Sequence, residues 1–84
     1  MRSIVALSIL LTAAVAAVQA RAATIHVNTL IDQQTSGNSL CTLREAIRNA
    51  NSTTGDLSGG DCVAGEIAAV DTIVFDVAGT IFLT

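Results

Sequence analysis

The sequence contains no lysine, proline, tryptophan or tyrosine, and apart from one histidine its basic residues are four arginines. Proteins that bind nucleic acid or anionic membranes normally carry a basic patch, whereas seven acidic residues here give a net charge of −3. We therefore expect no nucleic-acid partner. Two cysteines and one distant histidine, His26, do not supply four zinc ligands, so we also expect no metal site and no cofactor.

The first twenty residues have the organisation of a cleavable secretory signal. Arg2 gives a positively charged start, residues 4–18 are almost entirely apolar, and Val18-Gln19-Ala20 has small residues at the two positions that signal peptidase reads. We predict cleavage after Ala20, or shortly after at residues 22–23. The alternative is an uncleaved membrane anchor, but the run is shorter than the ~20 residues that comfortably span a bilayer. The expected location is secreted or cell-surface, with no stable membrane span after cleavage.

Removal of residues 1–20 leaves 64 residues with three arginines and seven acidic residues, so residues 21–84 form one domain at most, or part of one. A chain of about 60 residues buries only ~60% of its unfolded surface and is marginally stable alone. Cys41 and Cys62 enclose twenty residues. In an oxidising compartment we predict that they form a disulfide, which would contribute roughly 3 kcal/mol. The alternative is a pair of unlinked buried thiols.

A short helix is predicted over residues 43–51. Thr42 and Glu45 form the pattern T-x-x-E, a capping box in which each side chain bonds to the backbone N–H of the other residue. Cys41, just before the cap, can pack on Ala46 as a hydrophobic staple. Asn51 is expected to end the helix, because asparagine tolerates a left-handed backbone conformation.

The helix is expected to need a partner. Leu43, Ala46, Ile47 and Ala50 are spaced to form one apolar stripe. A helix this short falls below the ~12–15 residues that give marginal stability in isolation. We therefore expect Leu43 and Ile47 to dock on another apolar surface, and Arg44, off the stripe, to have a structural role.

Strands are expected on either side of the helix. Residues 24–28 alternate apolar and polar side chains, and residues 71–77 and 80–84 are rich in β-branched and aromatic residues. Ala78-Gly79 can form a corner between the last two runs, either as a hairpin or as the bend between successive strands of a solenoid coil. The strand pattern of residues 80–84 continues to Thr84 without a terminating turn, and the few strands leave sheet edges uncovered. We therefore expect the chain to be a fragment of a larger β-protein.

These motifs together resemble a known family. Cys41-Thr42-Leu43-Arg44-Glu45-Ala46-Ile47, followed by Ala50-Asn51, is similar to the Cys-Ser-Leu-Arg-Glu-Ala (CSLREA) motif at the N-terminus of exported right-handed parallel β-helix proteins. The similarity extends to Thr24-Ile25-His26-Val27-Asn28-Thr29 before it, and to Cys62 and residues 70–83 after it. It covers essentially residues 24–84, and the one departure in the motif is Thr42 for serine. Both residues can cap a helix.

The resemblance implies a mainly β fold: the start of a right-handed parallel β-helix, with a short helix covering its open N-terminal end. Solenoids need such caps because each end exposes an apolar cross-section and unpaired strand edges. The expected function is therefore a non-catalytic structural cap, whose partner is the protein's own downstream coils. The sequence does not identify a cell-surface glycan or another protein as a further partner.

Two alternatives stay open. The chain could be the N-terminal part of a polysaccharide-active β-helix enzyme whose active site lies beyond residue 84, or a small secreted disulfide-stapled binding module. Within the chain we expect no catalytic residues. His26 is expected to be an ordinary surface residue, residues 56–61 a solvated loop without the ligand pattern of an EF-hand, and Asp71 and Asp76 solvated strand-end residues.

Overall fold

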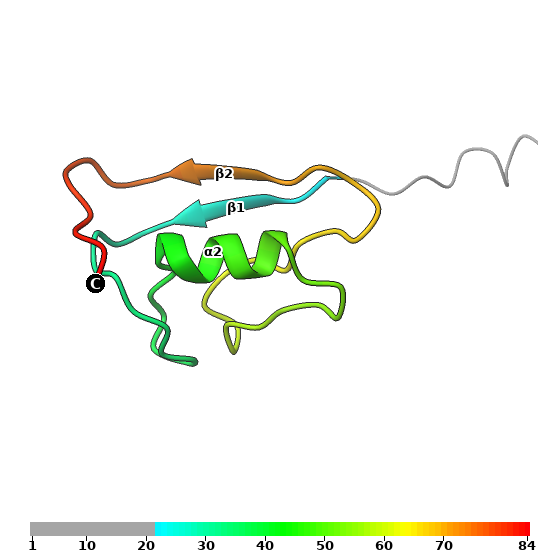
Figure 1. Cartoon of the computed structure of the whole chain (residues 1–84), viewed down its shortest axis with the longest axis horizontal. Coiled ribbons are helices and arrows are strands. Elements are labelled where there is room, and N and C mark those ends of the chain that lie inside the picture. Colours follow the sequence, from blue (N-terminus) through cyan, green and yellow to red (C-terminus); the bar gives the residue numbers. More distant parts are fainter. Residues whose placement is uncertain (1–21) are drawn as a thin grey trace, which may run out of the picture.

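The computed structural model describes residues 22–84, so the predicted signal segment lies outside the described residues. Within that range the order of elements is β1 (Thr24–Val27), α2 (Leu43–Ala50) and β2 (Thr72–Phe75). Figure 1 shows β1 lying between β2 and α2, with long loops joining the three elements. No helix among residues 22–84 has the length and apolar character needed to cross a membrane.

β1 and β2 form a two-stranded parallel sheet. Ile25 pairs with Ile73 and Val27 with Phe75 in register, although 48 residues separate the partners along the chain. Parallel strands require a long crossover, and α2 with its flanking loops supplies it. The last run of the sequence therefore does not make a hairpin with β2: residues 80–84 contain no strand, and they turn back beside the C-terminal end of β1 (Figure 1).

The core is small and lies between β1, α2 and the disulfide. It consists of Ile25, Val27, Cys41, Ala46 and Cys62, with Leu43, Ala50 and Ile73 packed against it. Burial alternates along β1, as predicted, with Ile25 and Val27 fully buried and the side chains between them exposed. The core contains no aromatic residue, because Phe75 and Phe82 are exposed.

The predicted stripe of α2 is only partly buried. Ala46 is fully buried, but Ile47 is 44% exposed, and the other buried positions of the helix are the polar residues Glu45 and Asn49. Small Ala46 lets the helix backbone approach β1 closely, whereas Glu45 and Asn49 turn inward because hydrogen bonds satisfy them. The helix is thus rotated away from the orientation that its apolar spacing predicts.

The helix ends where predicted, but by a different geometry. Asn51 is the C-cap with φ of −92°, in the right-handed region, and its N–H donates to the backbone oxygen of Ile47. Asn51 therefore ends the helix without the left-handed conformation that was the reason for expecting it there. Positive φ angles occur instead in the loops, at Ser39 and at five glycines.

Candidate functional site

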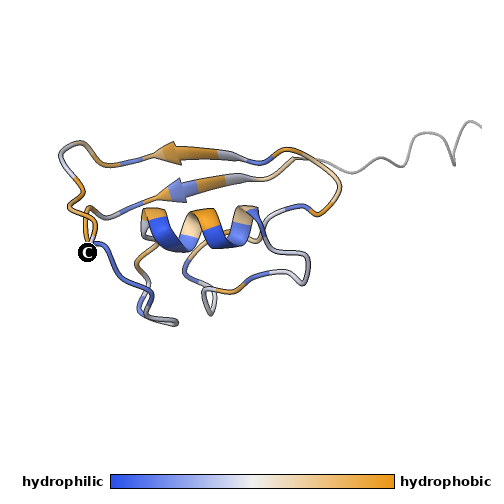
Figure 2. Ribbon diagram, in the orientation of Figure 1, coloured by the Kyte–Doolittle hydropathy of each residue, from blue (hydrophilic) through white to orange (hydrophobic). Residues whose placement is uncertain are grey.

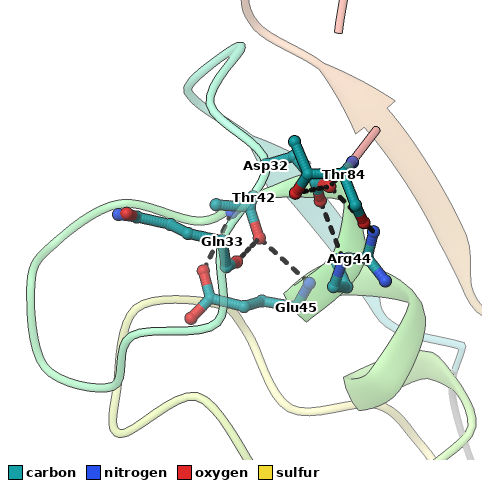
Figure 3. Close-up of polar contacts among 6 residues, drawn as sticks. All are labelled: Asp32, Gln33, Thr42, Arg44, Glu45 and Thr84. Carbon is teal, nitrogen blue, oxygen red and sulfur yellow. Dashed lines mark hydrogen bonds and ion pairs between the residues drawn. The ribbon is translucent and has the colours of Figure 1, made fainter. Parts of the chain in front are cut away.

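A cluster of polar contacts surrounds the N-terminus of α2 (Figure 3). Thr42 is the N-cap: its hydroxyl accepts from Glu45 N–H at 3.1 Å and donates to the backbone oxygen of Gln33 at 2.7 Å. Glu45 Oε1 in turn accepts from Thr42 N–H at 3.1 Å, so both hydrogen bonds of the capping box are present. Thr42 and Glu45 are both buried. The Thr42 hydroxyl therefore fixes the preceding loop as well as the helix start.

Arg44 and Asp32 form a bidentate ion pair beside this cap. Arg44 Nε and Nη2 donate to the two oxygens of Asp32 at 2.8 and 2.7 Å, and the Asp32 side chain is only 2% exposed. Asp32 Oδ2 also accepts from the backbone N–H of Thr84 at 2.8 Å. Figure 3 shows Thr84 beside Asp32 and above Arg44. These contacts join the segment after β2 to the start of α2.

The ion pair has a clear electrostatic consequence. Hydrogen bonds from the Arg44 guanidinium and from the Thr84 N–H hold the pKa of Asp32 well below its usual range. A carboxylate that is ionised and fully occupied by donors is a poor proton acceptor and a poor nucleophile. The structural role expected for Arg44 agrees with its pairing to the Asp32 carboxylate.

Asn49 organises the loop that carries Cys62, a role that the sequence analysis did not predict. Its Nδ2 donates to Asp56 Oδ1 at 2.8 Å and to the Val63 backbone oxygen at 3.0 Å. Its Oδ1 accepts from Leu57 N–H at 2.8 Å. The side chain is completely buried. The only signal in the sequence is an amide one turn after Glu45, on the face of the helix that turns out to be buried.

The aspartates of the 56–61 loop accept hydrogen bonds from nearby backbone and side-chain donors. Asp56 accepts from the Ser58 hydroxyl, Asn49 Nδ2, Ser58 N–H and Gly60 N–H, and these bonds hold its pKa well below the usual range. Asp61 accepts from the N–H groups of residues 37, 38 and 39. Within residues 22–84 no three metal-ligating side chains come together.

The predicted disulfide between Cys41 and Cys62 is present, with the Cα atoms 5.0 Å apart. Cys41 is 1% and Cys62 6% exposed, so the bond lies inside the core. It links the residue before the helix cap to the end of the loop organised by Asn49. A buried disulfide of this kind is compatible with an extracytoplasmic location.

The strand-end residues also have local partners. His26 Nδ1 lies 3.0 Å from Asp76 Oδ1, and both side chains are about half exposed. Asp71 is less solvated than expected: its Oδ1 accepts from Ala23 N–H at 3.0 Å and from Glu66 N–H at 3.1 Å. These contacts fix the two ends of the strand pair and do not assemble the side chains of a hydrolytic site.

Comparisons with known proteins add no family assignment: no protein-family model, no curated protein and no solved structure matches the chain. The geometry of the described residues, together with the sequence, is what supports a function.

Proposed function

We propose that this chain is a non-catalytic structural module that caps the N-terminal end of an exported or surface-associated right-handed parallel β-helix. The observation that carries the proposal is the in-register parallel pairing of β1 with β2, with α2 packed beside β1. Stacked parallel strands of equal register are what successive coils of a solenoid require. The resemblance to CSLREA-containing proteins supports the same function.

The two strands differ in how deeply their side chains are buried, as expected for a cap. β1 contributes two fully buried residues to the core with α2, whereas Ile73 is only partly buried and Phe75 is 52% exposed. Among residues 22–84, β2 pairs only with β1, which leaves the backbone groups along its outer edge without strand partners. A following coil would pair with this edge and cover Phe75.

The proposal can be tested by measuring whether the exposed edge of β2 causes the chain to self-associate. We expect the oxidised secreted chain to self-associate with rising concentration in sedimentation experiments. Phe75→Lys should reduce association by placing a charge beside the edge. Val63→Lys is a matched control, because Val63 is 53% exposed but directly follows Cys62 and is not part of β2.

The competing function is a complete small disulfide-stapled binding module. It is favoured by one observation: no buried side-chain nitrogen or oxygen among the described residues lacks a hydrogen-bond partner. A monomeric chain whose β2 amides resist hydrogen exchange as strongly as those of β1 would favour this module and contradict the cap. A polysaccharide-active parent would instead require catalytic side chains on coils outside this sequence.

A further inference from the structure

An apolar groove runs along the exposed side of α2. It has a volume of about 320 Å³ and is lined by Gln34, Leu43, Arg44, Ile47, Arg48 and Leu83. Ile47 is 44% and Leu83 68% exposed. Figure 2 shows orange, hydrophobic ribbon in α2 and in the C-terminal segment, which lies near the N-terminal end of the helix. Leu43 and Ile47 were both predicted to dock: Leu43 packs partly against the core, whereas Ile47 is exposed in this groove.

The charge around the groove differs from that of the rest of the molecule. Residues 22–84 contain seven acidic residues and, besides His26, two arginines, and both arginines line the groove while none of the acidic residues does. Arg44 is neutralised by Asp32. Arg48 Nη1 donates to the neutral Gln34 Oε1 at 3.0 Å, and no carboxylate of the described residues pairs with it.

We propose that this groove binds an acidic, apolar polypeptide segment, with apolar side chains over Leu43, Ile47 and Leu83 and a carboxylate that pairs with Arg48. The volume suits a few side chains of an extended segment and is small for a whole helix. The inference rests on the proposed function and adds the chemistry that the covering polypeptide must have.

A second copy of this chain is a poorer occupant than an acidic segment. If two grooves met across a two-fold axis, the arginines of one copy would face the arginines of the other, and like charges opposed at an interface are unfavourable. The segment must therefore bring the negative charge that the groove lacks.

The test uses the oxidised chain with its disulfide intact and three nine-residue peptides. The peptides alternate threonine and valine and carry glutamate, glutamine or lysine at the central position. Binding is followed by NMR at the methyl groups of Leu43, Ile47 and Leu83. We expect the glutamate peptide to bind roughly two- to fivefold more tightly than the glutamine peptide, and the lysine peptide to bind least tightly. The preference should shrink in 0.5 M salt, which screens the charges.

Arg48 variants provide the decisive comparison. Arg48→Lys should preserve the order of the three peptides, Arg48→Gln should abolish the preference for glutamate, and Arg48→Glu should reverse the order. Thr53→Glu changes the net charge by the same amount as Arg48→Gln but lies at an exposed position outside the groove. This control should keep the original order.

The possible results separate this inference from the cap itself. Equal binding of all three peptides, or an order that Arg48→Glu leaves unchanged, overturns the proposal that the groove selects an acidic segment. The cap proposal is unaffected by that result, because it rests on the exposed edge of β2. Three other results overturn the groove as the binding site of an acidic segment. They are peptide-induced shifts at Ile73 and Phe75 but not at the groove residues, absence of binding, and self-association through Ile47 without peptide. The cap is judged independently by the Phe75→Lys experiment.

Discussion

The disulfide region (residues 28–63) and the C-terminal region (residues 66–84) are stabilised by different kinds of interaction. The first contains the disulfide, a buried asparagine and three aspartates whose carboxylates bind backbone or arginine. The second contains one short strand and several exposed apolar side chains: Ile67, Val70, Phe75, Phe82 and Leu83.

This difference concerns how the backbone of each region is satisfied, because exposed apolar side chains also occur in the disulfide region, at Ile47 and Val63. Polar side chains in the disulfide region satisfy the backbone of long loops, which cannot otherwise be buried. The C-terminal region has apolar side chains and a strand edge that only another chain segment can cover. The predictions below test this division, starting with the largest expected effect.

Removal of the disulfide should destabilise the disulfide region most. Cys41→Ala with Cys62→Ala is expected to lower the free energy of unfolding by about 3 kcal/mol, because the unfolded chain regains the freedom of the closed loop. Urea titration of the variant and of the parent chain measures the loss. A variant as stable as the parent would show that the hydrogen-bonded loops alone hold this region.

Loss of the Asn49 amide should be nearly as damaging. Asn49→Ala removes a fully buried amide and leaves the partly buried Leu57 N–H and Val63 carbonyl without their partner, with an expected cost of about 2–3 kcal/mol. Asn51→Ala, at an exposed position of the same helix end, is the control and should cost far less. Similar urea midpoints for the two variants would contradict the role assigned to Asn49.

The helix cap should have an intermediate effect. Thr42→Ala removes an acceptor for Glu45 N–H and a donor to Gln33, and should cost ~1 kcal/mol or slightly more. Thr42→Ser keeps the hydroxyl and should recover most of the stability. If thermal unfolding shows serine to be as harmful as alanine, the methyl group of Thr42 matters more than its hydroxyl.

Acid should weaken the disulfide region through Asp56, and its contact with the C-terminal region through Asp32, which binds Thr84. The pKa values of Asp32 and Asp56 are lower in the folded chain than their ordinary unfolded values near 3.9. Their stabilising effect is therefore complete well above pH 4 and is lost as the pH falls through and below that value. We expect urea midpoints to decline between pH 5 and pH 2, by the usual behaviour of such groups.

Neutral variants assign the acid effect to its region. Asp56→Asn should flatten the pH dependence and speed amide exchange in residues 57–62. Asp32→Asn should flatten it while releasing Thr84, whose N–H binds Asp32. Exchange at Thr84 that is unchanged in Asp32→Asn would mean that the ion pair does not hold the C-terminal segment.

The smallest effect is expected at the strand pair. The His26–Asp76 contact is about half exposed on both sides, and surface pairs contribute ~0–1 kcal/mol. His26→Gln should therefore change the urea midpoint only slightly. A loss as large as that of Asn49→Ala would show that this contact, and not the β1 core, aligns the two strands.

The sequence alone determined the features that depend on neighbouring residues. The capping box needs only Thr42 and Glu45 three positions apart, and the burial of Ile25 and Val27 follows from the two-residue period of a strand. The pairing of Cys41 with Cys62 could also be predicted, because only two cysteines are present. Each of these inferences uses a short spacing or a choice with one solution.

Only the tertiary structure decided which face of α2 is buried and where distant segments meet. Apolar spacing favoured Leu43 and Ile47, but close packing of Ala46 on β1 and the hydrogen bonds of Glu45 and Asn49 turn the helix so that Ile47 lies in an open groove. The parallel pairing across 48 residues and the meeting of Asp32, Arg44 and Thr84 likewise depend on contacts between segments far apart in the chain. No local pattern encodes such contacts, because their free energy arises only when the loops have brought the segments together.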